Sequence, residues 1–160
     1  MHGNWVLPII VAGLAAIGVA VLGATITDLG PWYQSLEKPG WTPADPVFGI
    51  AWTLIFTLAA VAAVSTWRAA PSTRVSDTII GLFALNGFLN VLWSLIFFRM
   101  QRPDWAFAEL LLLWLSVGAL VVFCGRYSRL ASVALVPYLI WVTIAGALNW
   151  QVIELNGPFG

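Results

Sequence analysis

The positions of the charged side chains constrain this chain more than any other feature of its sequence. Its 160 residues include seven basic and seven acidic side chains, which fall at the edges of long uncharged stretches. A helix needs about 20 apolar residues to cross a hydrocarbon core of roughly 30 Å. No charged residue occurs in 3–27, 46–67, 78–98 or 130–153, and 105–125 contains only Glu109. The pattern predicts five membrane spans.

Helices rather than strands are expected in these spans. Hydrophobic residues make up 61% of the sequence, more than a soluble domain usually carries. The strands of a membrane barrel alternate apolar and polar residues, whereas 110–113 and 121–123 are apolar on every side. We therefore predict an all-α membrane protein, a five-transmembrane-helix bundle forming one domain over 1–160. The expected helices are about 5–27, 46–67, 78–98, 105–125 and 130–153, with a lid-like connection at 28–45.

Several classes of function are disfavoured by composition. The net charge is zero and no basic tract is present, so a nucleic acid partner is not expected. His2 is the only histidine and Cys124 the only cysteine. No Ser/His/Asp, Cys/His or paired-carboxylate set is evident, so conventional catalysis and a bound metal are not expected.

An odd number of spans places the two termini on opposite sides of the membrane. We name the N-terminal side X and the side of the 28–45 connection Y. Side X carries four basic residues (Arg68, Arg74, Arg126 and Arg129), and side Y carries three (Lys38, Arg99 and Arg102). The positive-inside rule therefore predicts that side X is cytoplasmic.

Polar and aromatic side chains concentrate in the Y half of the spans. At 1.5 Å per residue, Trp93 lies roughly 8 Å and Asn90 roughly 12 Å below the Y surface, and Asn86 roughly 18 Å. Polar groups in lipid face the bundle interior, where they pair with each other or line a cavity. Asn86 could serve as interhelical hydrogen-bond glue or as part of a site, and Glu109 is expected to have a structural partner, either Arg102 or an Asn.

The ten tryptophans divide into three groups, of which one, made up of Trp52, Trp93, Trp114 and Trp141, lies inside the spans. Those at the span ends suit the headgroup boundary and are expected to be anchors; they are Trp5, Trp67, Trp105 and Trp150. In the 28–45 connection, Trp32, Tyr33 and Trp41 occur among several prolines. Because these aromatic rings can bury much apolar surface, we expect a folded lid across the Y side.

A series of short motifs then occurs in order along the chain. They are Trp32-Tyr33-x-x-Leu36-x-Lys38-Pro39-x-Trp41-x-Pro43, Phe48-x-x-x-Trp52, Leu89-Asn90-x-x-Trp93-x-x-x-Phe97-Phe98, Pro137-Tyr138-Leu139-x-Trp141 and Leu148-Asn149. In these motifs the chain resembles the tryptophan-rich sensory protein family (TspO/MBR), which includes the mitochondrial translocator protein, also called the peripheral benzodiazepine receptor. The resemblance extends from about residue 32 to residue 150.

The resemblance implies a five-helix bundle, often a homodimer, that binds a porphyrin such as protoporphyrin IX under its first loop. Some relatives bind cholesterol, but the sterol pattern expected after Leu148-Asn149 is missing, since Trp150 stands at its Tyr position and Glu154 is acidic. Motif position and membrane depth together give the candidate porphyrin-pocket residues: Trp32, Trp41, Trp52, Asn86, Asn90, Trp93, Tyr138 and Trp141.

Three function classes follow from these observations. The first is a membrane sensor or scavenger that binds a tetrapyrrole, with light-dependent porphyrin breakdown as a role proposed in the family. The second is a transporter of porphyrin, lipid or another hydrophobic small molecule. The third is catalysis, which would have to use light, oxygen and tryptophan. No histidine lies within the spans, so metal-free porphyrin is the expected ligand and no cofactor is expected.

Overall fold

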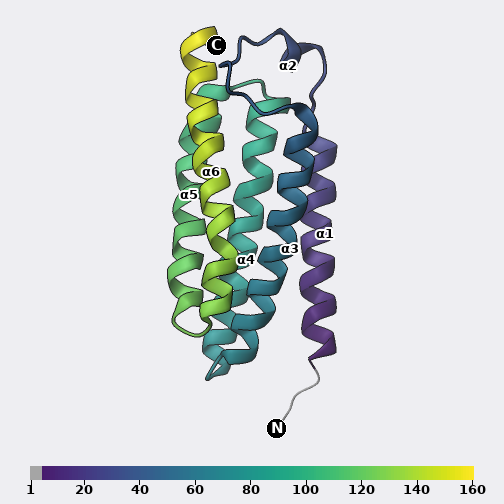
Figure 1. Cartoon of the computed structure of the whole chain (residues 1–160), viewed down its shortest axis with the longest axis vertical. Coiled ribbons are helices and arrows are strands. Elements are labelled where there is room, and N and C mark those ends of the chain that lie inside the picture. Colours follow the sequence, from purple (N-terminus) through teal and green to yellow (C-terminus); the bar gives the residue numbers. More distant parts are fainter. Residues whose placement is uncertain (1–4) are drawn as a thin grey trace.

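The computed structural model describes residues 5–160 and confirms the all-α fold. Five helices are long and apolar enough to cross a membrane, so the chain is an integral, multi-pass membrane protein. The long helices are α1 (Val6–Ile26), α3 (Asp45–Ala69), α4 (Thr73–Ser94), α5 (Pro103–Gly125) and α6 (Arg129–Asn156). They run side by side, and α1 begins at the opposite end of the bundle from the C-terminal end of α6 (Figure 1).

Local sequence explains where these helices begin. Pro103 occupies the first position of α5, where a missing N–H costs nothing. Ser72 and Ser128 cap α4 and α6 by accepting hydrogen bonds from Val75 N and Ala131 N. The start of α4 lies five residues before the predicted position 78. The prediction placed the start after Arg74 and Asp77 because these charged residues border the uncharged stretch. Charged side chains at headgroup level are compatible with a helix, so α4 includes both residues.

The core lies among α3, α4, α5 and α6. Leu113, Val117, Leu120 and Leu135 are fully buried there, and α5 and α6 pack along one another. Helix α1 contacts α3 and α4 at the edge of the bundle and contains no buried residue. It is therefore the least enclosed helix.

Two elements were not predicted from the sequence. The last turn of the third span is a π-helix, η1 (Leu95–Arg99), and the 28–45 connection contains a short helix, α2 (Pro31–Ser35). In Figure 1 the 28–45 connection lies at the same end of the bundle as the C-terminus. Both elements therefore lie on side Y.

Candidate functional site

A cavity of about 580 Å³ lies inside the Y half of the bundle. Residues from α1, α3, α4, η1 and α6 form its walls, and residues from the 28–45 connection also line it. We name it the Y-side cavity, lined among others by Ile17, Ala20, Tyr33, Lys38, Phe48, Trp52, Thr53, Phe56, Asn90, Trp93, Phe97, Phe98, Trp141 and Asn149. Its volume falls within the range of roughly 300–1,000 Å³ that is usual for small-molecule sites.

One group of aromatic rings in the cavity wall comes from α3 and α6. Trp52 stacks on Phe56 with ring centroids 5.5 Å apart, and its ring meets that of Trp141 edge-on at 6.3 Å. Phe48 contacts Trp141 at 5.7 Å. The i, i+4 spacing of Phe48, Trp52 and Phe56 places all three on one face of α3.

A second aromatic group comes from α4, η1 and α2. Trp93 stacks on Phe97 at 5.2 Å, and Phe97 in turn contacts Trp32 at 5.9 Å. Phe98 contacts Tyr33 at 5.8 Å. A π-helical turn adds a residue to the helical repeat and redirects the side chains that follow. Here η1 brings two adjacent phenylalanines, both buried, to the cavity and to the connection above it.

Polar side chains near the cavity form two hydrogen-bond networks. In the first, Asn90 Nδ2 donates to the Tyr138 hydroxyl (3.0 Å), which donates to Asn86 Oδ1 (2.9 Å). Asn86 Nδ2 then donates to Ser116 Oγ (3.0 Å). In the described part of the chain, the side-chain oxygen of Asn90 accepts no hydrogen bond, although Asn90 lines the cavity.

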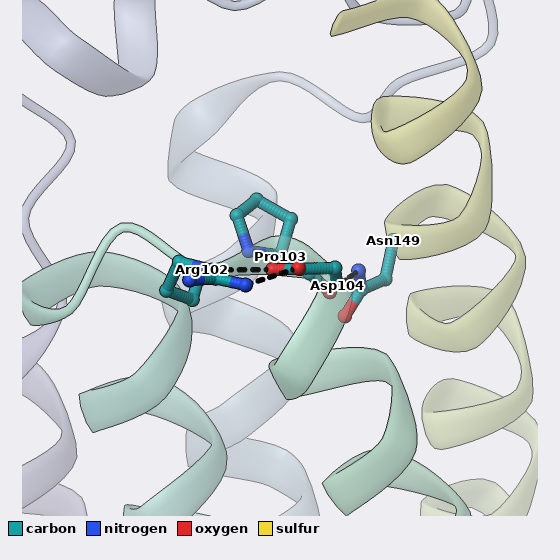
Figure 2. Close-up of polar contacts among 4 residues, drawn as sticks. All are labelled: Arg102, Pro103, Asp104 and Asn149. Atoms are coloured by element: carbon teal, nitrogen blue, oxygen red, sulfur yellow. Dashed lines mark hydrogen bonds and ion pairs between the residues drawn. The ribbon is translucent and has the colours of Figure 1, made fainter. Parts of the chain in front are cut away.

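The second network surrounds Asn149. Its Oδ1 accepts a hydrogen bond from Trp93 Nε1 (3.1 Å), and its Nδ2 donates to the backbone oxygen of Pro103 (2.8 Å) (Figure 2). Asn149 therefore connects α4, α5 and α6 with a side chain that is 1% exposed. It also lines the Y-side cavity.

Charge at the cavity comes from Lys38 and Asp45, which both line it. Lys38 Nζ lies 4.5 Å from the centre of the Tyr33 ring and donates to the backbone oxygen of Leu36 (3.1 Å). Burial raises the pKa of the Tyr33 hydroxyl, and the Asp45 carboxylate raises it further. Tyr33 is therefore neutral at physiological pH, and Lys38 supplies the positive charge.

The eight residues predicted as pocket residues fall into two sets in the structure. Four of them line the Y-side cavity: Trp52, Asn90, Trp93 and Trp141. The other four do not line it: Trp32, Trp41, Asn86 and Tyr138. The indole N–H of Trp41 instead donates to Gln151 Oε1 (3.0 Å), while Asn86 and Tyr138 are occupied by the first network. For Asn86, these hydrogen bonds favour a role in joining helices over a role in the site.

The prediction that Glu109 pairs with Arg102 or an Asn is wrong. Both carboxyl oxygens of Glu109 are buried, and neither has a hydrogen-bond partner among the described residues. Arg102 instead donates two hydrogen bonds to Asp104, from Nε (2.9 Å) and Nη2 (2.6 Å) (Figure 2). Asp104 lies only two residues from Arg102, at the start of α5, whereas Glu109 lies deeper in the membrane.

Sequence reasoning missed several cavity residues. Phe48, Phe97 and Lys38 belong to the motifs, but depth and polarity did not single them out. Asn149 belongs to the Leu148-Asn149 motif but was not among the candidate pocket residues. His2 lies outside the described residues, and the described residues contain no group of three or more His, Cys, Asp or Glu side chains that could hold a metal ion.

The sequence of this chain matches a known protein family. The TspO/MBR family model matches residues 9–155. Protein CrtK of Rhodobacter capsulatus is 37% identical over 142 residues, 88% of this chain and 89% of the relative. The tryptophan-rich sensory protein of Cereibacter sphaeroides is 33% identical over 156 residues, covering 98% and 95%. The human translocator protein is 31% identical over 122 residues, covering 76% and 72%. The chain therefore belongs to the TspO/MBR family.

Proposed function

We propose that this protein binds a tetrapyrrole, protoporphyrin IX, in the Y-side cavity and serves as a membrane sensor or scavenger of that ligand. The observation that carries the proposal is an aromatic-walled cavity of about 580 Å³ with one cationic side chain among its lining residues. Aromatic walls suit a flat, apolar ring system, because offset-stacked and edge-to-face contacts both stabilise it.

The walls supply both kinds of aromatic contact. Trp52 and Trp141 meet at nearly right angles, with an interplanar angle of 89°, so a flat ligand that stacks on one meets the edge of the other. Trp93 and Phe97 offer a second, nearly parallel pair at 30°. A macrocycle between these groups would replace contacts with lipid by contacts with rigid rings.

The polar groups support recognition of the ligand's edge. Protoporphyrin IX carries two carboxylates, and the Lys38 ammonium is the cation among the cavity-lining residues. The free side-chain oxygen of Asn90 can accept from a pyrrole N–H of metal-free porphyrin. A charge-assisted hydrogen bond is about twice as strong as a neutral one, so Lys38 is the polar contact expected to contribute most.

The homodimer implied by the family resemblance is part of the proposal. Native mass spectrometry of the protein in mild detergent tests it directly. A monomer at every concentration and in every detergent used would contradict a homodimer without affecting the porphyrin site.

The experiment for the site is a titration of purified protein with protoporphyrin IX, followed by porphyrin absorbance and tryptophan quenching. We expect saturable binding that weakens in Trp141→Phe and Asn90→Ala, and about tenfold in Lys38→Met. Trp150→Phe is the matched control, because Trp150 is 49% exposed and does not line the cavity.

Two results would oppose the proposal. Equal losses in Trp141→Phe and Trp150→Phe would indicate partition of porphyrin into detergent rather than a site. Uptake of porphyrin into protein-containing vesicles that requires Trp141 would favour the transporter over the sensor.

A further inference from the structure

We propose that a second groove, between α1 and α3, binds one acyl chain of an anionic phospholipid from the side X leaflet, with the lipid phosphate at Arg68. The groove has a volume of about 590 Å³ and includes Ala12, Gly13 and Ala16 of α1 and Ala60, Val64 and Arg68 of α3 in its lining. We name it the α1–α3 groove. It is independent of the proposed porphyrin function.

Small side chains on α1 create the groove. At Gly13 an added Cβ would meet no atom within 4 Å, so the space beside α1 is not filled by protein. None of the α1 residues is buried, although α1 contacts α3 along the groove. In a bilayer, such a space is filled by hydrocarbon.

The groove is long enough for a lipid chain. Its lining on α3 runs from Thr53 to Arg68, a separation of fifteen residue steps that spans about 22 Å of helix. One leaflet contributes about half of a hydrocarbon core of roughly 30 Å. A chain that starts at Arg68 therefore fits within the groove and can end before Thr53 and Phe56, which also line the Y-side cavity.

The groove wall is apolar because its hydroxyl groups are already bonded. Thr53 and Thr57 donate to backbone oxygens one turn earlier on α3, both at 2.7 Å. Ser65 Oγ is bonded to Ser128 Oγ at 2.6 Å. Both Thr hydroxyls are therefore used within α3 and Ser65 is paired with Ser128 at the start of α6, so the mostly apolar wall suits a methylene chain.

The charge at the X end selects the headgroup. Arg68 lies in the last turn of α3, is exposed, and forms no ion pair with any residue that the structure describes. A guanidinium binds phosphate through paired N–H donors and is attracted to anionic lipid at the membrane surface. A net negative headgroup is thus expected to bind better than a zwitterionic one.

Native mass spectrometry of the full chain in detergent tests this site. Phosphatidylglycerol and phosphatidylcholine with identical acyl chains are titrated separately. We expect the first to bind about five-fold more tightly, and Arg68→Gln to remove the difference. Arg74→Gln is the matched control, because Arg74 lies on the same side but does not line the groove.

A second pair of variants tests the groove itself. Ala16→Phe fills it and should weaken binding of both lipids, whereas Ala15→Phe adds the same ring to an α1 position outside the groove lining and should not. The proposal is overturned if Arg68→Gln keeps the preference or if both Phe variants behave alike. It is also overturned if oleate binds while phosphatidylglycerol does not, or if a second copy of the chain displaces lipid on dimerisation.

Discussion

The Tyr138 hydroxyl lies at the centre of the polar interior of the bundle. It accepts from Asn90 and donates to Asn86, and Asn86 continues the chain of hydrogen bonds to Ser116. The network thereby joins α4, α5 and α6 at a depth where water cannot substitute for a lost partner. Its side chains act as structural connectors, and Asn90 also borders the cavity.

Removing this hydroxyl should cost stability. In Tyr138→Phe, two buried amide groups lose their partner, and we expect the free energy of unfolding to fall by about 1 kcal/mol. Reversible denaturation in mixed detergent micelles measures this free energy of unfolding. Tyr127→Phe is the control, since the Tyr127 hydroxyl has no hydrogen bond to the described residues. A Tyr138→Phe variant as stable as Tyr127→Phe would show that the network contributes nothing.

We predict that Trp52 and Trp141 take part in any light-dependent breakdown of bound porphyrin. If bound protoporphyrin IX is consumed under light, the loss should require oxygen and should slow in Trp52→Phe and Trp141→Phe, because their indoles line the cavity and can be oxidised. The measurement is the rate of porphyrin absorbance loss, corrected for the amount bound. Glu109→Gln is the control, because an acid–base mechanism would need a titratable group near the reacting atom. Loss of the reaction in Glu109→Gln alone would mean that a conventional active site was missed.

At the scale of elements, the 28–45 connection is tied to the end of α6. Asn156 Oδ1 accepts from Glu37 N, and Asn156 Nδ2 donates to Glu37 O, both at 2.8 Å. The Trp41 indole donates to Gln151 on the same helix. On the other side, Tyr33 is buried against Phe98. These contacts should slow opening of the connection above the Y-side cavity.

Breaking this attachment should loosen the connection. In Asn156→Ala, both hydrogen bonds to Glu37 are lost, and we expect faster hydrogen exchange over 32–41 and faster porphyrin dissociation. Bound porphyrin should slow exchange there in the wild type. Glu154→Ala is the control, because Glu154 is exposed on the same helix and forms no ion pair with a described residue. Fast exchange over 32–41 in the wild type, with and without porphyrin, would contradict an ordered lid.

At the scale of the whole molecule, five spans and the charge distribution define the topology. Side X holds Arg68, Arg74, Arg126 and Arg129 near the helix ends, so we predict that it is cytoplasmic. Reporter fusions that are active on only one side of the membrane should give opposite results at the two termini. The N-terminal fusion should report the cytoplasm. Equal results at both ends would contradict five spans.

Much of the fold could be predicted because a charged side chain, or a polar group without a hydrogen bond, has a high free energy in the hydrocarbon core of a bilayer. Four uncharged stretches, and a fifth whose only charged residue is Glu109, predicted the five helices, and their order predicted which polar residues lie in the Y half. Helix ends were less accurate, as at α4, because Arg74 and Asp77 sit at the headgroups, where charge is tolerated. The π-helix at 95–99 left no signal, since Leu95, Ile96, Phe97 and Phe98 continue the apolar pattern of the helix before it.

For the site, the sequence by itself determined which residue types reach the Y half of the membrane, because depth follows directly from helical rise. Only the tertiary structure decided which of them share a cavity. Depth does not give the direction in which a side chain points, and that depends on helix rotation and on hydrogen bonds between distant residues. Asn90 and Asn86 lie on the same stripe of α4, yet Asn90 lines the cavity whereas Asn86 is bonded to Tyr138 and Ser116. Arg102 pairs with Asp104, and the buried carboxyl oxygens of Glu109 have no hydrogen-bond partner among the described residues, an outcome that the depth of Glu109 did not determine.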